Sequence, residues 1–162
     1  MEQRENMQRV QGLMVILGSF ANALEVLLGR GSEGVSRRAG RKVGLSAPVK
    51  KTAKGDLLKA LDLVQEEMRA LGMNWPVRAY KKSTETELVT DNQGVKELKL
   101  AIENCLVRCT LSRYGFPQRG SLCNTKHGVF CGLFDQIYGS KSTMSIIHAG
   151  ENGCMLKLHI RG

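Results

Sequence analysis

Cysteine and histidine side chains are the residues of this sequence best suited to chemistry, and three of them are spaced by four. Cys123, His127 and Cys131 would share one face of a helix that begins early enough to contain them all. Cys105 and Cys109 have the same spacing. Two thiolates and an imidazole are good ligands for zinc or iron, because metals of intermediate softness prefer sulfur and nitrogen. The alternative is that these cysteines pack in a core as small apolar side chains.

The number and spacing of the cysteines narrow the redox chemistry. Five cysteines, an odd number, indicate thiols or metal ligands rather than a disulfide framework. No close CxxC pair supports an iron–sulfur cluster, although a metal or thiol redox protein stays a hypothesis.

The longest apolar run, residues 12–28, is interrupted by Ser19, Asn22 and Glu25, so we expect no membrane span. The sequence shows no signal-peptide pattern, which predicts a cytoplasmic protein.

Motifs of nucleotide-dependent and hydrolytic enzymes are missing from the sequence. It contains no P-loop or Rossmann glycine pattern, no GxSxG and no HExxH. Glu66 and Glu67 are adjacent, so on a helix they would face different ways and could not act as an acid–base pair. We therefore expect no nucleotide cofactor, and a binding protein rather than an enzyme.

Positive charge is concentrated in one segment of the chain. The net charge is +9, and the region between Arg30 and Lys59 is strongly basic. This charge favours an anionic partner, which could be a nucleic acid, an acidic protein face or a membrane surface, although a solvated loop and helix face would look the same. The segment lacks the aromatic residues on which single-stranded bases stack. The candidate anion- or partner-binding residues are Arg37, Arg38, Arg41, Lys42, Lys50, Lys51 and Lys54.

Hydrophobic periodicity predicts the elements that must position these residues. We expect helices over 10–28, 33–45 (capped by Ser32), 56–70, 105–114 and about 129–137, and strands over 75–80, 87–90, 98–102, 144–148 and 154–160. Because strands and helices do not alternate as βαβ units, we predict an α+β domain with an antiparallel sheet. One domain covers residues 1–162. The wide apolar face of its N-terminal helix (residues 1–29) indicates a dimer contact, a ligand-tunnel wall or a core helix.

Glycines and cysteines occur in an order that resembles the V4R (4-vinyl reductase) family. The likeness covers residues 30–162. One part is the set of glycines expected in an early helix, Gly34, Gly40 and Gly44. Two more are the pairs Asn104-Cys105 and Leu122-Cys123. The last are Gly128, Gly132 and Gly139, spaced along a later helix, and Gly150, four residues before Cys154.

This resemblance implies a four- to five-stranded antiparallel sheet with helices packed on it. It also implies a non-catalytic sensor or carrier that binds a small apolar molecule, such as an aromatic, a hydrocarbon or a lipid chain, and we expect a homodimer. The residues expected to line the ligand cavity, with plain core packing as the alternative, are Trp75, Tyr80, Phe130, Phe134 and Tyr138.

The same resemblance implies a structural zinc site. The resemblance implies that regulators with this domain bind zinc through four side chains. Two are cysteines at the positions of Cys123 and Cys154, and the other two are a Glu and a Cys on the first strand of the hairpin. This chain has Thr143 and Ile146 near those last two positions. The candidate replacements are His148, Cys131 and His127, with His148 preferred because it is close in sequence to Cys154. Packing also explains Cys154, which continues the alternating row of Leu156, Leu158 and Ile160.

Overall fold

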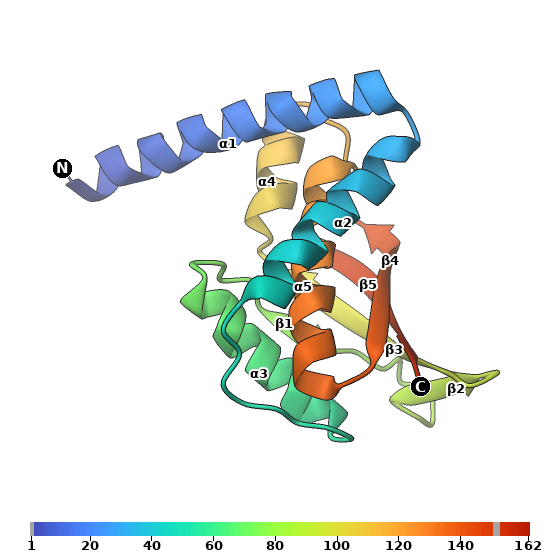
Figure 1. Cartoon of the computed structure of the whole chain (residues 1–162). Helices are drawn as coiled ribbons and strands as arrows, with labels where there is room; N and C mark the ends of the chain where they lie inside the picture. The colour runs from blue at the N-terminus through green and yellow to red at the C-terminus, as the bar shows by residue number, and fades with distance from the viewer. Residues whose placement is uncertain (1, 151–152) are drawn as a thin grey trace.

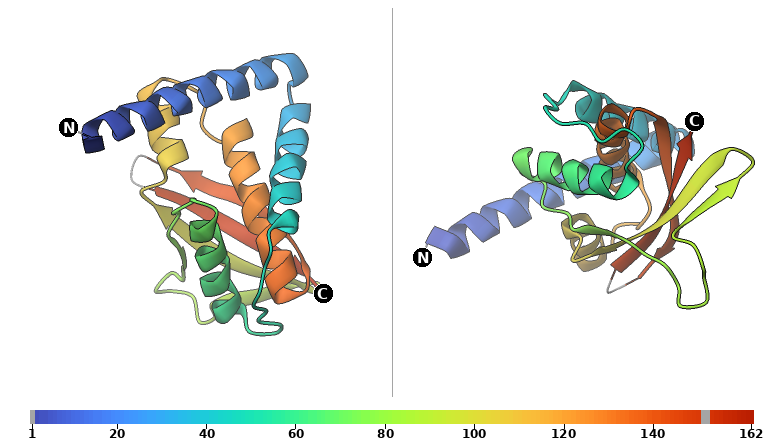
Figure 2. Two further views of the ribbon diagram at one scale, coloured as in Figure 1. Left: turned by 60° about the vertical axis from the view of Figure 1, so that its left-hand side comes forward. Right: turned by 90° about the horizontal axis from the view of Figure 1, so that it is seen from below.

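The computed structural model describes residues 2–150 and 153–162. Helices lie on one face of an antiparallel sheet, and a long N-terminal helix crosses one end of the molecule (Figures 1 and 2). The helices are α1 (Glu2–Leu28), α2 (Gly31–Ser46), α3 (Leu57–Ala70), α4 (Leu106–Arg113) and α5 (Ser121–Tyr138). The strands are β1 (Val77–Ala79), β2 (Val89–Asn92), β3 (Val95–Glu103), β4 (Lys141–Ala149) and β5 (Gly153–Arg161).

The sheet has five strands in the order β1-β3-β5-β4, and β2 pairs with β3 beyond the end of β1. All pairs are antiparallel. The α+β class and the antiparallel sheet, for which the resemblance implied four to five strands, are therefore confirmed. The boundaries of the short strands β1 and β2 differ from the expected ones by one or two residues, because little periodicity marks where these strands begin and end.

The core lies between the sheet and α5, which also contacts α2 and α3. Alternate residues of β5 point into it, as the period of two predicts: Leu156 and Leu158 are fully buried. From the helical side, Phe130, Phe134 and Tyr138 form a stacked column, with ring centroids 6.3 Å and 5.1 Å apart. These rings sit four residues apart on α5, so each lies over the next along the helix.

Helices α2 and α5 approach each other closely because glycines line their contact. A Cβ on Gly44 would lie 2.9 Å from the Cα of Gly132, and a Cβ on Gly132 would lie 2.9 Å from the Cα of Gly44. Gly40 and Gly128 are placed in the same way against the backbone of the opposite helix. The glycine spacing seen in the sequence thus lets two backbones pack without intervening side chains.

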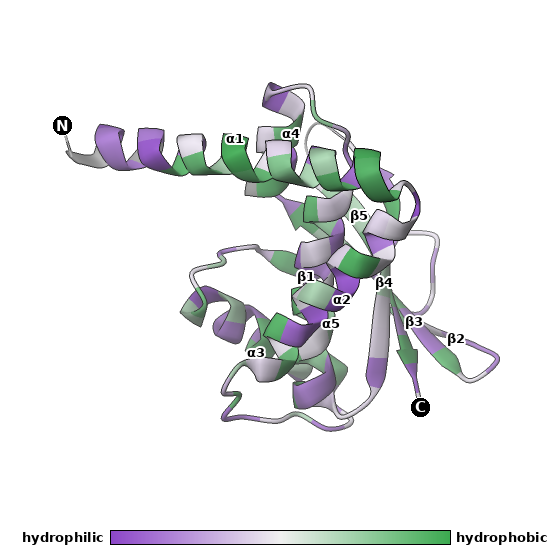
Figure 3. Cartoon of the chain, turned by 45° about the horizontal axis from the view of Figure 1, so that its top comes forward, coloured by the Kyte–Doolittle hydropathy of each residue, from purple (hydrophilic) through white to green (hydrophobic). Residues whose placement is uncertain are grey.

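Helix α1 contacts α2, α4 and α5, and Figure 3 shows that hydrophobic positions recur along it. Most of its large apolar side chains are exposed. Leu13, Phe20 and Leu27 are 57%, 77% and 81% exposed. The core-helix interpretation is therefore wrong. By length and composition alone, Arg4–Leu28 is also apolar enough to cross a membrane, although the polar interruptions predicted otherwise. The dimer contact stays a prediction.

The start of α2 also differs from the sequence prediction. Ser32 lies inside the helix, where its hydroxyl donates to the carbonyl of Gly29 at 2.7 Å. The N-cap residue is Arg30, which has helical backbone angles and makes no side-chain cap. The tight Gly29–Arg30 turn therefore replaces the predicted serine cap.

Candidate functional site

A small cavity lies between α4, α5 and the β4–β5 hairpin, and we call it the Lys126 cavity. Its volume is about 10 Å³, room for roughly one water molecule. It is therefore no open hollow for an apolar guest in this conformation. The described residues that line it are Cys105, Arg108, Gln118, Arg119, Cys123, Lys126, His127, Ile146, Ala149, Cys154 and Leu156.

The first two turns of α5 bring three of these side chains to the cavity. Helix α5 begins at Ser121, early enough to contain the predicted cysteine–histidine face. Cys123, Lys126 and His127 stand at positions i, i+3 and i+4, which share one side of a helix. The Asn124 side chain fixes the preceding turn by donating to the carbonyl of Gly120 at 3.1 Å.

Lys126 is the most unusual residue of the site and was missed by sequence reasoning. It is only 4% exposed. Its ammonium nitrogen lies 3.0 Å from the sulfur of Cys105 and 5.3 Å from the ring centroid of Trp75. The signal that could have found it is its position between Cys123 and His127 on the same helix face.

Two further buried side chains, Arg108 and His127, line the cavity, and each has one nitrogen without a hydrogen-bond partner. Arg108 donates to the carbonyl of Gly150 at 2.9 Å, but its Nε has no partner. His127 Nδ1 also has no partner. Burial, followed by the positive charges of Lys126 and Arg37, lowers the pKa of His127 from 6.5 to about 3. The imidazole is therefore neutral at physiological pH.

The buried thiols are in a poor environment for metal binding. Burial raises the pKa of Cys123 and Cys154, and it raises the pKa of Cys131 to about 11. Protonated thiols do not ligate zinc, so the ion would have to displace their protons in an apolar setting. Cys131 is buried one turn beyond His127, and its thiol faces Ser142 rather than the Lys126 cavity.

The residues present do not fit the zinc site that the V4R resemblance implies. Within residues 2–150 and 153–162, no group of three or more His, Cys, Asp or Glu side chains is placed to hold a metal ion. Ile146 contributes an apolar wall, and the ammonium of Lys126 points at Cys105 where a cation would have to sit. The positive charge of Lys126 would repel a metal cation, and the site has too few ligands to hold one.

His148, the preferred replacement ligand, faces away from Cys154 because β4 contains a bulge. Ile146 pairs with Leu156, but His148 pairs with Met155 and Ala149 with Cys154. The extra residue, Ile147, turns His148 to the exposed face and puts Ala149 into the cavity wall. Regular alternation over the predicted strand 144–148 would put His148 on the same face as Met144 and Ile146, so the bulge makes that part of the strand prediction wrong.

The predicted ligand-lining aromatics are not gathered around one cavity. Phe130, Phe134 and Tyr138 form the core column described above. Trp75 lies beside Lys126, and Tyr80 lies beyond β1 with the Arg78 guanidinium 6.0 Å from its ring centroid. None of the five lines the Lys126 cavity itself, and Trp75 lies against Lys126, which does.

The predicted basic patch divides into structural and exposed residues. Arg37 donates to the side chain of Asn124 at 2.8 Å, and Arg41 bridges α2 to Asp135 and to the carbonyl of Ser142. These two arginines hold α2 to α5 and β4, so they are not free to bind a partner.

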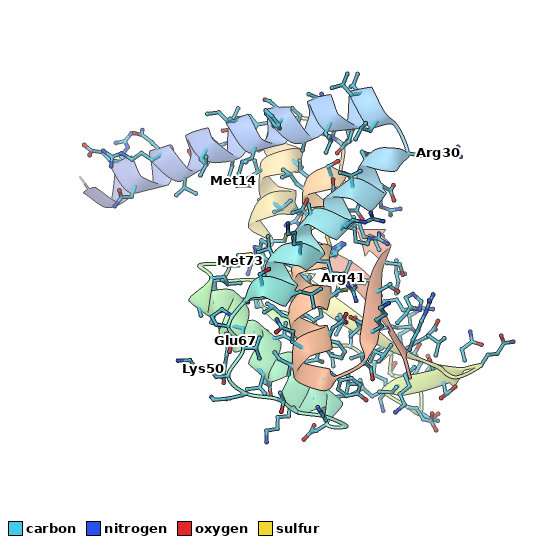
Figure 4. The ribbon with its side chains drawn as sticks, in the orientation of Figure 1. Met14, Arg30, Arg41, Lys50, Glu67 and Met73 are labelled. Atoms are coloured by element: carbon cyan, nitrogen blue, oxygen red, sulfur yellow. The ribbon has the colours of Figure 1, made fainter. Side chains whose placement is uncertain are left out.

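The other members of the basic set lie at the surface. Lys51 pairs with Glu66 at 3.3 Å, and Lys50 and Lys54 are exposed in the loop between α2 and α3, where Figure 4 shows Lys50 pointing outward. Arg38 and Lys42 border a shallow depression of about 580 Å³ on the outer face of α2.

Neither a family model nor a curated protein matches the sequence. The structure is similar to the crystal structure of the phenol-responsive sensory domain of the transcription activator PoxR with phenol, at a TM-score of 0.61 and 15% identity. The match covers 91% of this chain and 74% of that chain. The α+β architecture expected from the sequence is thus the observed one, and this chain shares the fold of that domain.

Proposed function

We propose that this protein binds a small molecule at the Lys126 cavity, as a sensor or carrier rather than as an enzyme. The observation that carries the proposal is an interior site with buried, unpaired hydrogen-bonding groups, from Arg108 and His127, in a fold shared with a phenol-responsive sensory domain. Buried polar groups normally have partners, and their exceptions cluster at functional sites. Convergent polar groups in an otherwise apolar interior are typical of ligand sites.

Helix α4 is the wall that must move to admit a ligand larger than water. It has eight residues, and its N-cap, Cys105, makes no side-chain cap. Left-handed residues flank it on both sides: Asn104 has φ 51°, and Gly115 has φ 69°. A short helix between two turns can shift as a unit, because the turns absorb the change in backbone angles.

The space uncovered by α4 would have mixed walls. Ile146, Leu156 and Ala149 are apolar, whereas α5 presents Lys126 and His127. Such walls suit a small ring or short chain with one polar end. Trp75, packed against Lys126, would sense the arrival of such a ligand.

Trp75 offers a direct test because it is the sole tryptophan of the chain. Toluene, phenol and benzoate should be titrated while tryptophan emission is followed, with excitation beyond the absorption of phenol. We expect a saturable change with at least one of them, accompanied by a rise in the unfolding temperature, since a ligand that binds the folded state stabilises it.

A cavity-filling pair of variants controls the site. Ala149→Phe puts a ring into the cavity wall, whereas Ile147→Phe puts the same ring on the exposed face of the same strand. We expect Ala149→Phe to abolish the response and Ile147→Phe to keep it, with unchanged far-ultraviolet circular dichroism in both. Absence of a saturable response in the unmodified protein to all three compounds would refute the proposal.

The other partners expected from the sequence stay predictions. A second copy of the chain would be held by the exposed apolar face of α1, and an acidic protein or nucleic acid by the exposed cations Arg38, Lys42, Lys50 and Lys54. The cytoplasmic location also stays a prediction.

A further inference from the structure

The Lys126 cavity is cationic, and no carboxylate lines it among the residues that the structure describes. Lys126, Arg108 and Arg119 contribute positive charge, and the remaining polar lining is His127, Gln118 and thiols. We propose that the ligand carries an anionic head of the carboxylate class, which binds the ammonium of Lys126. This inference rests on the proposed function and specifies the chemistry of its ligand.

The burial of Lys126 carries the argument. A buried ammonium is unstable unless it is paired, because it has left water without a compensating charge. Elsewhere the chain supplies such partners even near the surface: the half-exposed Lys157 pairs with Glu97 at 2.9 Å. Lys126 is far more buried, yet its partners in the described structure are a cysteine sulfur and an indole ring. Both are weaker partners for a cation than a carboxylate.

The orphaned nitrogens of Arg108 and His127 are an independent observation. Both side chains are more than nine-tenths buried, both line the Lys126 cavity, and each has one nitrogen without a partner. A carboxylate has two acceptor oxygens, so it can take hydrogen bonds from the ammonium and from a neighbouring donor together. Arg108 Nε always carries a hydrogen, and His127 Nδ1 donates in the tautomer that is protonated there. A neutral apolar ligand would leave the Arg108 donor buried and unsatisfied.

The cavity must widen to hold an anionic head. Its volume of about 10 Å³ has room for roughly one water, which is less than the three heavy atoms of a carboxylate, so the movement of α4 is needed for the head as well as for the body. The head would then bind at Lys126, and the apolar body would lie in the space that α4 vacates, against the apolar wall formed by Ile146 and Leu156.

Toluene, phenol and benzoate test this proposal because they share a ring and differ in the head. At neutral pH these heads are apolar, neutral polar and anionic, respectively. Affinities should be measured by Trp75 fluorescence and by calorimetry. We expect benzoate to bind about tenfold or more tighter than toluene, since a hydrogen bond to a charged group contributes more than a neutral one.

Variants of Lys126 locate the head. Lys126→Met keeps the length of the side chain and removes its charge, and Lys126→Gln serves as a second variant that keeps a donor. Both should weaken benzoate binding about tenfold or more and leave toluene binding unchanged or tighter. Lys42→Met, at an exposed lysine of α2, is the matched control and should leave all three affinities unchanged.

The possible outcomes separate the two proposals. Toluene or phenol binding as tightly as benzoate would overturn the anionic head and leave small-molecule binding intact. Benzoate binding that is indifferent to both Lys126 variants would also overturn it, because the head would then lie elsewhere. Failure of all three compounds to bind would refute the proposed function, and the anionic head with it.

Discussion

Glu25 of α1 caps α5: its carboxylate accepts a hydrogen bond of 2.6 Å from the backbone N–H of Ser121. The N-cap residue of α5, Gly120, has no side chain with which to cap the helix. A carboxylate from a distant helix thus satisfies a free N–H at the positive end of the α5 dipole. It also ties α1 to the element that carries Cys123, Lys126 and His127.

Removing this cap should destabilise the domain. We expect Glu25→Ala to lower the free energy of unfolding by about 0.5–2 kcal/mol, the usual effect of losing a helix cap. Glu5→Ala, at an exposed position on the same helix, is the control and should change stability little. Urea unfolding followed by circular dichroism measures both. Equal effects of the two substitutions would mean that Glu25 does not act as a cap.

The glycine contact between α2 and α5 gives a second prediction. A methyl group at Gly40 would meet the backbone of Thr125, so Gly40→Ala must push the helices apart. We expect it to cost about 2 kcal/mol or more, as overpacking against backbone does. Gly34→Ala lies on the same helix with nothing within 4 Å, and it should stabilise by about 0.5–1 kcal/mol through helix propensity. Thermal unfolding of the two variants would compare them, and similar signs would contradict the close helix contact.

The buried histidine predicts a loss of stability in mild acid. Burial lowers the pKa of His127 to about 3, from 6.5. Between these values the unfolded chain binds a proton at this residue and the folded chain does not, so the free energy of unfolding falls as the pH drops below about 6.5. At about pH 5 the loss should be near 2 kcal/mol.

Variants isolate the contribution of His127. His127→Gln should lose less stability than the unmodified protein when urea unfolding is compared at about pH 7 and about pH 5. His148→Gln, at an exposed residue, should keep the original pH dependence. If His127→Gln and the unmodified protein lose the same amount, the imidazole is not held neutral by burial.

The thiols should differ in reactivity in the order of their environments. Cys109 is the exposed cysteine, whereas burial raises the pKa of Cys131 to about 11. Because the thiolate is the reactive form, we expect iodoacetamide to label Cys109 first and Cys131 last in the folded protein. Peptide mass spectrometry measures the order, and labelling in denaturant shows that all the thiols can react. Early labelling of Cys131 would contradict its buried position.

Local patterns predicted much of this fold, because the spacing of apolar residues close together in the sequence distinguishes helices from strands. The row from Leu156 to Ile160 identified β5, and the spacing of Cys123, His127 and Cys131 placed them on one helix. The glycines of the two helices were noticed as a pattern, but their mutual contact joins residues about ninety positions apart. No local period reports such a contact.

The composition of the site was harder to predict for the same reason. Lys126 looks like a surface residue in the sequence, and its burial arises only when α4 and the β4–β5 hairpin cover α5. The bulge at Ile147 leaves no signal in residue type, yet it decides which of His148 and Ala149 faces inward. The zinc expectation came from the V4R resemblance, and its preferred replacement ligand, His148, was chosen for its closeness in sequence to Cys154, which says nothing of the face on which His148 lies.

The bulge in β4 decides which side chain of that strand faces the Lys126 cavity, and so decides the chemistry of the cavity wall. If Ile147 paired with Met155 in a regular ladder instead of bulging, the imidazole of His148 would stand opposite Cys154 in place of the methyl group of Ala149. The proposed lysine-centred anion site and a thiol–imidazole metal site are thus separated, in this architecture, by whether one residue is paired or bulged rather than by the exchange of a whole ligand set.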